Sequence, residues 1–315
     1  MNTPQNPAVL LIAPVSETLQ ERLASVSVVH RLYEQPAPQT FLQKYGPQIG
    51  AVVTRGDVGV DNATLALLPR AGLVAIFGVG TDAVDLAYTR ARRIAVTITS
   101  GVLTNDVADL AMALLLAGAR RLCGNDRFVR EGRWLASSPG LGTQVSGKRI
   151  GILGMGNIGR AIARRAAGFD MQIRYHDREP LPEREYLWRD SVDALARDSD
   201  FLVIAASGGA ANRGLINAAV LNAMPAHAWL INVARGSLVD EDALIQALQT
   251  GGIAGAGLDV YADEPHVPSD LLALDNVILL PHVASATAET RQKMGDVLFA
   301  NVQAYFNGAV LPNAI

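Results

Sequence analysis

Three segments far apart in the chain carry side chains suited to reducing a carbonyl group. Arg235 lies in N-V-A-R-G, Glu264 in D-V-Y-A-D-E-P and His282 in L-P-H. Reduction of a 2-oxo acid needs a cation for the carboxylate and a proton donor for the carbonyl oxygen, and Arg235 and His282 supply these. A carboxylate such as Glu264 on one imidazole nitrogen fixes the tautomer and favours the charged form. We therefore predict these three residues as the catalytic set, although a lone histidine after a strand is more often structural.

A glycine motif, G-M-G-N-I-G, stands between an apolar run at 149–153 and a helical pattern at 160–167. In this context the first glycine permits a tight turn, the second lets the backbone approach a pyrophosphate, and the third lets the helix pack close to the strand. The helix N-terminus presents free N–H groups to the phosphates. The predicted dinucleotide-binding residues are Gly154, Gly156, Asn157, Ile158 and Gly159.

The next predicted strand ends in Asp177 and Arg178, which point to different cofactors. Asp177 follows the first glycine by 177 − 154 = 23 residues and suits the ribose hydroxyls of NAD. Arg178 suits the extra phosphate of NADP through a charge-assisted pair. Arg174 and Arg184 lie nearby, and this basic group is equally well explained as an ordinary solvated cluster.

Short apolar runs alternate with helical segments throughout the chain, and they are apolar almost continuously, as in parallel strands covered on both faces. We predict an α/β fold of two Rossmann-like or flavodoxin-like domains with parallel sheets and a cleft between them. The first series of predicted strands is 8–13, 51–54, 73–77 and 95–98, and the second is 149–153, 171–176, 201–205, 229–233, 255–258 and 277–280.

A long helix at 105–121, capped by Thr104 or Asn105, is predicted to bridge the two domains. A last helix at 287–306 is predicted to return to the first domain. The expected domains are therefore a discontinuous substrate-binding domain, 1–99 plus 284–315, and a dinucleotide-binding Rossmann domain, 100–283.

The composition narrows the class of protein. The 315 residues include 27 Lys and Arg against 30 Asp and Glu, a net charge of −3, which argues against a nucleic-acid partner. Half of the residues are hydrophobic, as expected of a compact domain protein. The lone Cys123 provides no disulfide or thiolate metal cluster, and the uncharged N-terminus does not resemble a signal peptide. We expect a cytoplasmic protein without a metal site, and no membrane span.

Taken together, the motifs resemble the D-isomer-specific 2-hydroxyacid dehydrogenase family over nearly the whole chain. In that family the arginine, glutamate and histidine are catalytic, and the backbone amides of the first-domain G-V-G loop hold the substrate carboxylate. The resemblance thus implies substrate binding by Val79 and Gly80, and Arg55 is a further candidate in the same cleft. The matching segments are 78–85, 101–111, 154–159, 232–241, 259–265 and 281–282.

Within the family, the chain is most similar to glyoxylate and hydroxypyruvate reductases, including hydroxyphenylpyruvate reductases. The stretch around Ser207 replaces a P-x-T-x-x-T run common in NAD-dependent members, and Arg178 stands where NADP-preferring members carry an arginine. The resemblance implies NADP(H) in preference to NAD(H), with Ser207, Val233 and Asp259 as further cofactor-binding residues. It also implies a homodimer formed through the bridging helix and residues 130–134, although the helix could instead be buried within one subunit.

Other functions fit the same fold. The family contains dinucleotide-sensing transcriptional corepressors, which would make this an interaction protein rather than an enzyme. It also contains enzymes that act on phosphoglycerate, aryl lactates, formate or phosphite.

Overall fold

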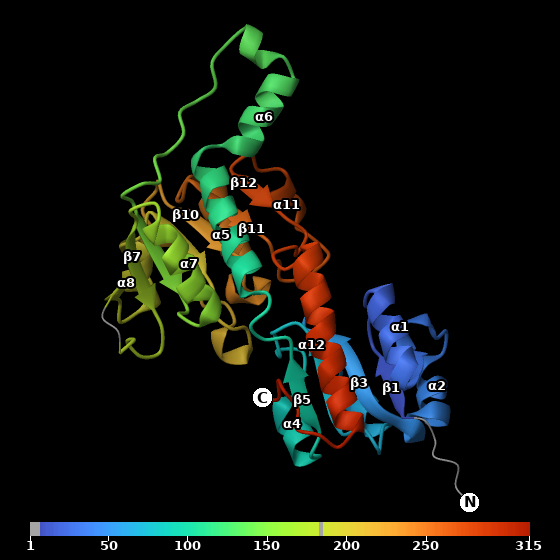
Figure 1. Ribbon diagram of the computed structural model, residues 1–315. Helices are drawn as coiled ribbons and strands as arrows, with labels where there is room; N and C mark the ends of the chain where they lie inside the picture. Colours follow the sequence, from blue (N-terminus) through green and yellow to red (C-terminus); the bar gives the residue numbers. More distant parts are fainter. Residues whose placement is uncertain (1–6, 183–184) are drawn as a thin grey trace, which may run out of the picture. The chain divides into compact units, whose positions relative to one another are not determined.

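The structure is a computed structural model that describes residues 7–182 and 185–315. It divides into two compact units: unit 1 is the chain up to Leu103 together with Thr287–Ile315, and unit 2 is Thr104–Ala286 (Figure 1). The first part of unit 1 ends 103 − 99 = 4 residues later than predicted, and unit 2 ends 286 − 283 = 3 residues later than predicted. Arg184 and the N-terminal segment interpreted above lie outside the described residues, apart from Pro7.

Unit 1 contains a parallel sheet that has five strands in the described part of the chain, in the order β2-β1-β3-β4-β5. Helix α12 returns from the end of the chain and packs on β4. β2 was not predicted, because its side chains are only partly covered at the sheet edge and its apolar run is short. The strands are β1 Ala8–Leu11, β2 Val28–Arg31, β3 Ile49–Arg55, β4 Leu73–Phe77 and β5 Ala95–Ile98; the helices are α1 Glu17–Val26, α2 Pro38–Tyr45, α3 Asn62–Ala66, α4 Leu86–Ala91 and α12 Ala288–Phe306.

Unit 2 contains a parallel sheet in the order β12-β11-β10-β9-β6-β7-β8, counted over the described residues. Its first strand, β6, lies between β7 and β9, so the order reverses there; such a switch point creates a ligand-binding crevice at the carboxyl ends of the strands. The two-residue β8 was not predicted. The strands are β6 Arg149–Leu153, β7 Gln172–His176, β8 Leu187–Trp188, β9 Phe201–Ile204, β10 Trp229–Asn232, β11 Gly255–Leu258 and β12 Val277–Leu279.

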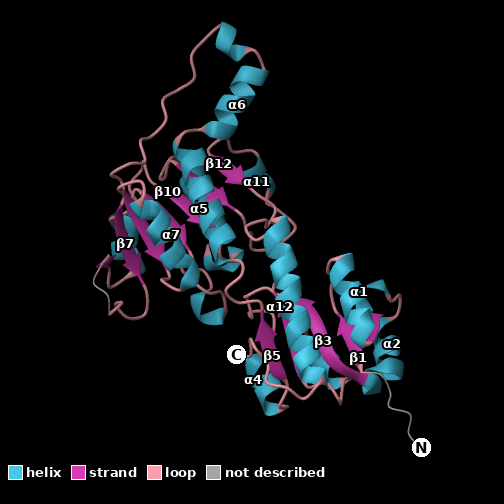
Figure 2. Ribbon diagram, viewed as in Figure 1, coloured by secondary structure: helices cyan, strands magenta, loops and turns pink. Residues whose placement is uncertain are grey.

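Helices cover the sheet of unit 2 (Figure 2). α5 and α7 pack against each other, and α9 packs against both α8 and α10. α5 begins at Thr104, so both predicted cap residues lie within its first turn and the cap prediction was wrong. The helices are α5 Thr104–Ala119, α6 Leu122–Arg130, α7 Asn157–Ala167, α8 Val192–Arg197, α9 Ala218–Ala223, α10 Glu241–Gln249 and α11 Ser269–Leu272.

Each unit has a hydrophobic core of its own. In unit 1 the core is built around Leu10, Val52 and Ile76, from neighbouring strands. In unit 2 a second cluster includes Leu202 and Leu230. The predicted class, two parallel-sheet α/β domains, is confirmed. None of the described helices is both long and apolar enough to cross a membrane.

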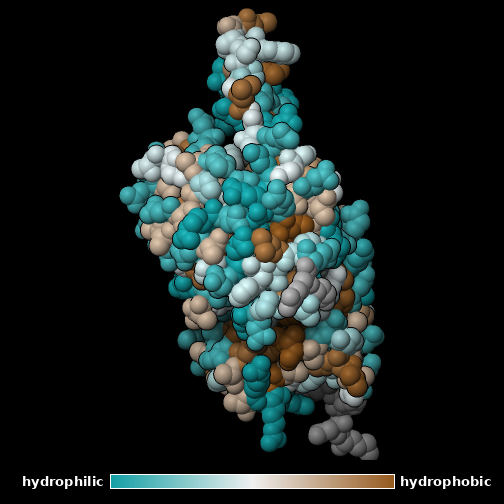
Figure 3. Space-filling model, turned by 90° about the vertical axis from the view of Figure 1, so that its left-hand side faces the viewer, coloured by the Kyte–Doolittle hydropathy of each residue, from teal (hydrophilic) through white to brown (hydrophobic). Residues whose placement is uncertain are grey.

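A segment that we call the arm follows α5 in unit 2 and comprises residues 120–143. Its helix α6 has no buried residue. Leu135 and Leu141 are 96% and 95% exposed, and Trp134 is 67% exposed. Figure 3 shows hydrophobic side chains, coloured brown, on the end of this arm. By contrast, the apolar face of α5 is buried within unit 2 against β10, β11 and α7, which is the alternative weighed above for this helix.

Candidate functional site

The glycine motif forms a tight turn between β6 and α7. Gly154 has φ +93°, and a Cβ atom there would lie 2.7 Å from the Cα of Ala206 after β9. A Cβ on Gly159 would lie 2.0 Å from the carbonyl oxygen of Gly154, so only glycine lets the helix approach the turn this closely. A Cβ on Gly156 would meet nothing within 4 Å. The turn therefore leaves open space beside its middle glycine, at the N-terminus of an 11-residue helix.

Helix α7 begins earlier than predicted. Gly156 is its N-cap, and Asn157 and Ile158 are its first residues. Asn157, Ile158 and Gly159 thus supply the first turn, where backbone N–H groups have no partner within the helix and attract anions.

Asp177 and Arg178 follow β7 and lie beside this turn. The carboxylate of Asp177 accepts hydrogen bonds of 2.8 Å from the backbone N–H groups of Met155 and Arg178. The Arg178 side chain is exposed, and no ion pair with another described residue is recorded for it. Asp177 is therefore fixed to the glycine turn, whereas Arg178 extends into solvent.

The parallel register aligns the functional segments along one edge of the sheet of unit 2. Leu153, Ile204, Asn232 and Leu258 occupy adjacent positions on β6, β9, β10 and β11, and Leu258 pairs with Leu279 on β12. The next residues therefore form a row: Gly154, Ala205, Val233, Asp259 and Leu280. Within it Val233 is buried, and Ser207, two residues beyond Ala205, is exposed.

Arg235 lies on a loop that its neighbours hold tightly. The buried Asn232 side chain accepts from the Ala234 N–H and donates to the Arg235 carbonyl, at 3.1 and 2.9 Å. A Cβ on Gly236 would lie 1.8 Å from the carbonyl carbon of Tyr261, so this loop presses against the backbone after β11. The half-buried guanidinium of Arg235 donates through Nη1 to the Ala234 carbonyl at 2.7 Å.

Glu264 and His282 form a direct pair. Oε2 of Glu264 lies 2.7 Å from Nδ1 of His282, and Oε1 accepts from the Tyr261 N–H at 3.0 Å. The two side chains are 26% and 35% exposed, so the pair is partly shielded from water. The carboxylate thus orients the ring, and Nε2 is the imidazole nitrogen opposite this contact.

Asp259 holds the turn that carries His282. Its fully buried carboxylate accepts from the N–H groups of Val283 and Ala284, both at 2.8 Å, and its carbonyl accepts from the His282 N–H. His282 has φ +53°, a left-handed conformation that is unfavourable for a side chain with a Cβ and that these hydrogen bonds stabilise. Burial raises the pKa of Asp259 despite the two N–H donors. Asp259 is therefore a positioning residue, and its contact with a cofactor stays a prediction.

Tyr261 and Glu241 make further hydrogen bonds to the loops around Glu264 and His282. Tyr261 donates to the Leu280 carbonyl at 3.0 Å, and burial and then the nearby Asp259 raise its pKa to about 12. The Ala262 N–H donates to Glu241 at 2.8 Å. Sequence reasoning missed these supports and that of Asn232, because they depend on contacts between loops.

The predicted substrate residues lie in unit 1, at the carboxyl ends of β3 and β4. Arg55 ends β3 and pairs with Asp57. Among the described residues no acceptor is recorded for the N–H groups of Val79 or Gly80, and both residues are half-buried. A Cβ on Gly56 would lie 3.0 Å from the Gly80 carbonyl oxygen, so the two loops touch.

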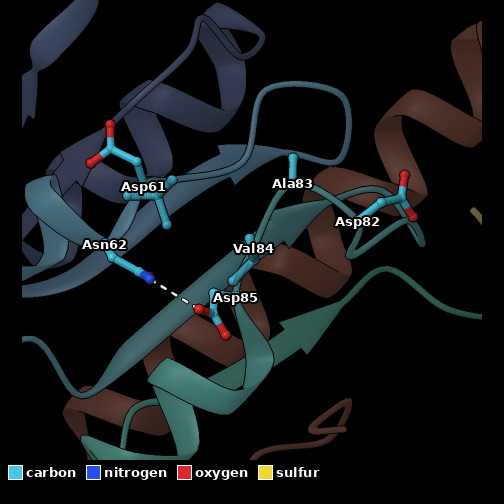
Figure 4. A pocket seen from close by; sticks show the side chains of 7 residues that line it. Asp61, Asn62, Asp82, Ala83, Val84 and Asp85 are labelled. Atoms are coloured by element: carbon cyan, nitrogen blue, oxygen red, sulfur yellow. Dashed lines mark hydrogen bonds between the residues drawn. The ribbon is translucent and has the colours of Figure 1, made fainter. Parts of the chain in front are cut away.

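An open hollow elsewhere in unit 1 is unsuitable for an oxo acid. Asp61, Asp82 and Asp85 are among its lining residues (Figure 4). Asn62 and Asp85 point toward each other, 2.9 Å apart, and this hydrogen bond lowers the pKa of Asp85. Asp61 and Asp85 also cap α3 and α4. Asp61 and Asp85 thus stabilise helix ends, and the carboxylates that line the hollow would repel an anionic substrate.

Residues 112–284 match the family described as D-isomer specific 2-hydroxyacid dehydrogenase, NAD binding domain. The chain belongs to this family. It is 43% identical over 303 residues to a hydroxyphenylpyruvate reductase of Plectranthus scutellarioides and 42% identical over 303 residues to glyoxylate/hydroxypyruvate reductase A of Arabidopsis thaliana. Each match covers 96% of this chain and 97% of the relative.

A solved structure extends the likeness to three dimensions. An NADPH-dependent glyoxylate/hydroxypyruvate reductase of Sinorhizobium meliloti, in complex with NADP and malonate, has a TM-score of 0.91 and 36% identity, covering 98% of this chain and 97% of that one. The predicted family membership is thereby confirmed. The prediction that the protein is an NAD(P)-dependent oxidoreductase is confirmed as well. The matched segment, 112–284, lies within unit 2, where the glycine turn is found.

Proposed function

We propose that this enzyme reduces a small 2-oxo acid, such as glyoxylate or hydroxypyruvate, to the D-2-hydroxy acid with NADPH, with NADH as the alternative donor. The observation that carries the proposal is the Glu264–His282 pair at 2.7 Å, on the same sheet edge as the glycine turn. A proton donor beside a dinucleotide site is what carbonyl reduction requires. The reductases reported above support this substrate class, and they do not favour the sensor alternative.

The residues of the glycine turn fit a dinucleotide. The open space beside Gly156 lets a pyrophosphate approach the backbone, and the first turn of α7 offers it N–H donors. When bound, the nicotinamide supplies the hydride. The exposed Arg178 would bind a 2′-phosphate, and Asp177, already held by two N–H groups, is less available to the ribose. The NADP complex of the S. meliloti reductase also favours NADPH.

His282 and Arg235 would have different roles toward the substrate, proton transfer and carboxylate binding. His282 delivers a proton from Nε2 to the carbonyl oxygen, while Glu264 holds the opposite nitrogen and stabilises the imidazolium before transfer. Arg235 anchors the carboxylate through its guanidinium, which suits a bidentate contact. General acid catalysis of this kind accelerates a reaction about 10²- to 10⁴-fold.

Unit 1 would bind the same substrate. The N–H groups of Val79 and Gly80 have no recorded acceptor among the described residues, which suits them to a carboxylate. Arg55 ends the neighbouring strand and adds positive charge at this edge. In our proposal these groups contribute to substrate binding, whereas the proton transfer belongs to unit 2.

We further propose a cytoplasmic homodimer. The exposed Trp134, Leu135 and Leu141 of the arm support an interface with a second copy, because large apolar side chains exposed along one segment often mark an interaction surface. The one cysteine, Cys123, is exposed and free, which suits a reducing compartment.

A substrate panel tests the proposed reaction. The purified protein is assayed with glyoxylate, hydroxypyruvate, hydroxyphenylpyruvate and 3-phosphohydroxypyruvate, each with NADPH and with NADH, by the loss of reduced-nicotinamide absorbance. We expect turnover of glyoxylate or hydroxypyruvate, faster with NADPH. Because glycolate is achiral, the configuration is read from the glycerate formed from hydroxypyruvate, which we expect to be the D form by chiral chromatography. Absence of turnover with every pair, or an L product, would refute the proposal. Formate and phosphite with the oxidised cofactors test the remaining alternatives.

A further inference from the structure

We propose that Arg291 is a further substrate-binding residue, which together with Arg55 and the loop after β4 binds an anionic group of the 2-oxo acid. This inference rests on the proposed function. Arg291 lies outside every motif that the sequence analysis used, and it reaches the site only because α12 returns to unit 1.

The N-terminal end of α12 is held within unit 1. Its N-cap is Thr287, and the hydroxyl of the buried Thr290 contacts the Val102 carbonyl at 3.4 Å. The helix packs on β4, and the Arg291 guanidinium lies over the Phe77 ring, with Cζ 5.6 Å from the ring centroid. Phe77 is the last residue of β4, directly before the G-V-G loop. Arg291 is therefore beside the loop whose amides lack recorded acceptors.

Arg291 lies among other charged groups. Arg291 is half-buried, and its pKa is lowered by burial and then by Arg55, while Asp57 acts in the opposite direction. Asp57 pairs directly with Arg55. No carboxylate among the described residues is recorded in an ion pair or hydrogen bond with Arg291. The charge of Arg291 therefore lies at a partly desolvated position beside a second guanidinium, without an ion pair of its own recorded among the described residues.

The chemistry of this position suits an anionic ligand. A half-buried cation is stabilised by a bound anion, and the planar fork of arginine matches a carboxylate. The N–H groups of Val79 and Gly80, for which no acceptor is recorded among the described residues, are donors that also suit an anion, and they lie a few residues beyond Phe77. The backbone N–H donors and the arginine side chains at the carboxyl ends of β3 and β4 therefore favour a carboxylate as ligand. Every 2-oxo acid carries this group. A purely structural stacking of Arg291 on Phe77 would need no such donors.

The test separates binding from chemistry. In Arg291→Gln we expect the KM for glyoxylate to rise about ten- to a hundredfold, as for a lost charge-assisted hydrogen bond, with kcat and the KM for NADPH nearly unchanged. The dissociation constant of the unreactive analogue oxalate, measured by calorimetry in the presence of NADPH, should rise by a similar factor. Lys293→Gln is the matched control, because it removes one positive charge from an exposed position two residues along the same helix.

Arg291→Lys keeps the charge without the bidentate fork, and we expect an intermediate KM for glyoxylate; this variant decides the matter if Arg291→Gln does not fold. A KM and an oxalate dissociation constant within twofold of wild type in a folded Arg291 variant would overturn the inference. So would an equal effect of Lys293→Gln, which would indicate a general charge effect. A wild-type enzyme without turnover would instead refute the proposed function itself, so the two failures are distinguishable.

Discussion

At the scale of single residues, Glu264 has two tasks, because one oxygen holds the Tyr261 backbone and the other holds His282. In Glu264→Gln the amide has one acceptor oxygen in place of two, so it cannot accept from both the Tyr261 N–H and a protonated Nδ1 of His282, and the negative charge beside the imidazole is lost. We expect kcat/KM for reduction to fall about tenfold or more, because His282 is no longer oriented by a charged partner. The measurement is kcat/KM for glyoxylate at saturating cofactor.

Asp263→Asn provides the control for this charge. Asp263 precedes Glu264 in the chain, but its side chain is 90% exposed. Its removal should leave kcat/KM almost unchanged. If both variants lower kcat/KM equally, the effect comes from the general field of the loop rather than from the contact with His282.

The proposed role of Arg178 in cofactor preference can also be measured. In our proposal its exposed guanidinium binds the 2′-phosphate, a group that NADH lacks. We predict that Arg178→Ala raises the KM for NADPH about ten- to a hundredfold and leaves the KM for NADH nearly constant. Steady-state kinetics with both donors gives the ratio. Equal changes with the two donors would show that Arg178 does not contact the distinguishing phosphate.

At the scale of the elements, the glycine turn contains a matched pair of positions. A Cβ at Gly159 would clash with the Gly154 carbonyl oxygen at 2.0 Å, whereas a Cβ at Gly156 would meet nothing within 4 Å. Gly159→Ala should therefore force α7 away from the turn and lower the free energy of unfolding by about 1 to 3 kcal/mol.

Gly156→Ala should keep that free energy within about 0.5 kcal/mol, because no atom must move. It should nevertheless weaken binding of NADPH, since the new methyl group occupies the space left for the pyrophosphate. Thermal unfolding and cofactor titration of both variants distinguish the two roles. A Gly156→Ala variant with wild-type cofactor affinity would mean that the pyrophosphate lies elsewhere.

Buried parallel strands and the glycine turn could be predicted from the sequence, because continuous apolar runs and a glycine motif are local signals. The strands at 73–77, 95–98, 149–153 and 255–258 have the predicted bounds. β2 and β8 were missed, because edge strands are short and partly exposed. The contact of Glu264 with His282 could be proposed from residue types. The sequence did not predict that Asp259 supports the His282 turn or that Arg291 lies over Phe77, because these contacts join segments that only the fold brings together.

At the scale of the whole molecule, an ion cluster at the amino ends of the strands makes unit 2 sensitive to acid. Burial would raise the pKa of Asp200, but hydrogen bonds from Arg149 and His227 outweigh it and hold the pKa well below its usual range. The stabilisation is complete above about pH 4, the unfolded value, and is lost as the pH falls further, since the unfolded chain takes up the proton first.

Asp200→Asn should therefore lower the free energy of unfolding by about 1 to 3 kcal/mol at neutral pH and flatten its decline below pH 4. Thermal unfolding between pH 7 and pH 3 measures both effects. Asp170→Asn, on a turn after α7, is a control that removes a carboxylate for which no ion pair is recorded among the described residues. An unchanged acid dependence in Asp200→Asn would assign the acid sensitivity to other groups.

The exposed leucines of the arm predict that the protein assembles into a dimer. Exposed leucines at 96% and 95% are unfavourable in water, and covering them with a second copy would remove most of that cost. We predict a mass of 2 × 33.4 = 66.8 kDa in solution, and a shift toward 33.4 kDa in Leu135→Ser/Leu141→Ser, measured by light scattering after size exclusion. Leu272→Ser is the control, since Leu272 is exposed in the same unit but outside the arm. Helix α6 of the arm has no buried residue, so the two leucine substitutions should leave unit 2 folded. A wild-type enzyme that is monomeric, or a double variant that stays dimeric, would refute this interface.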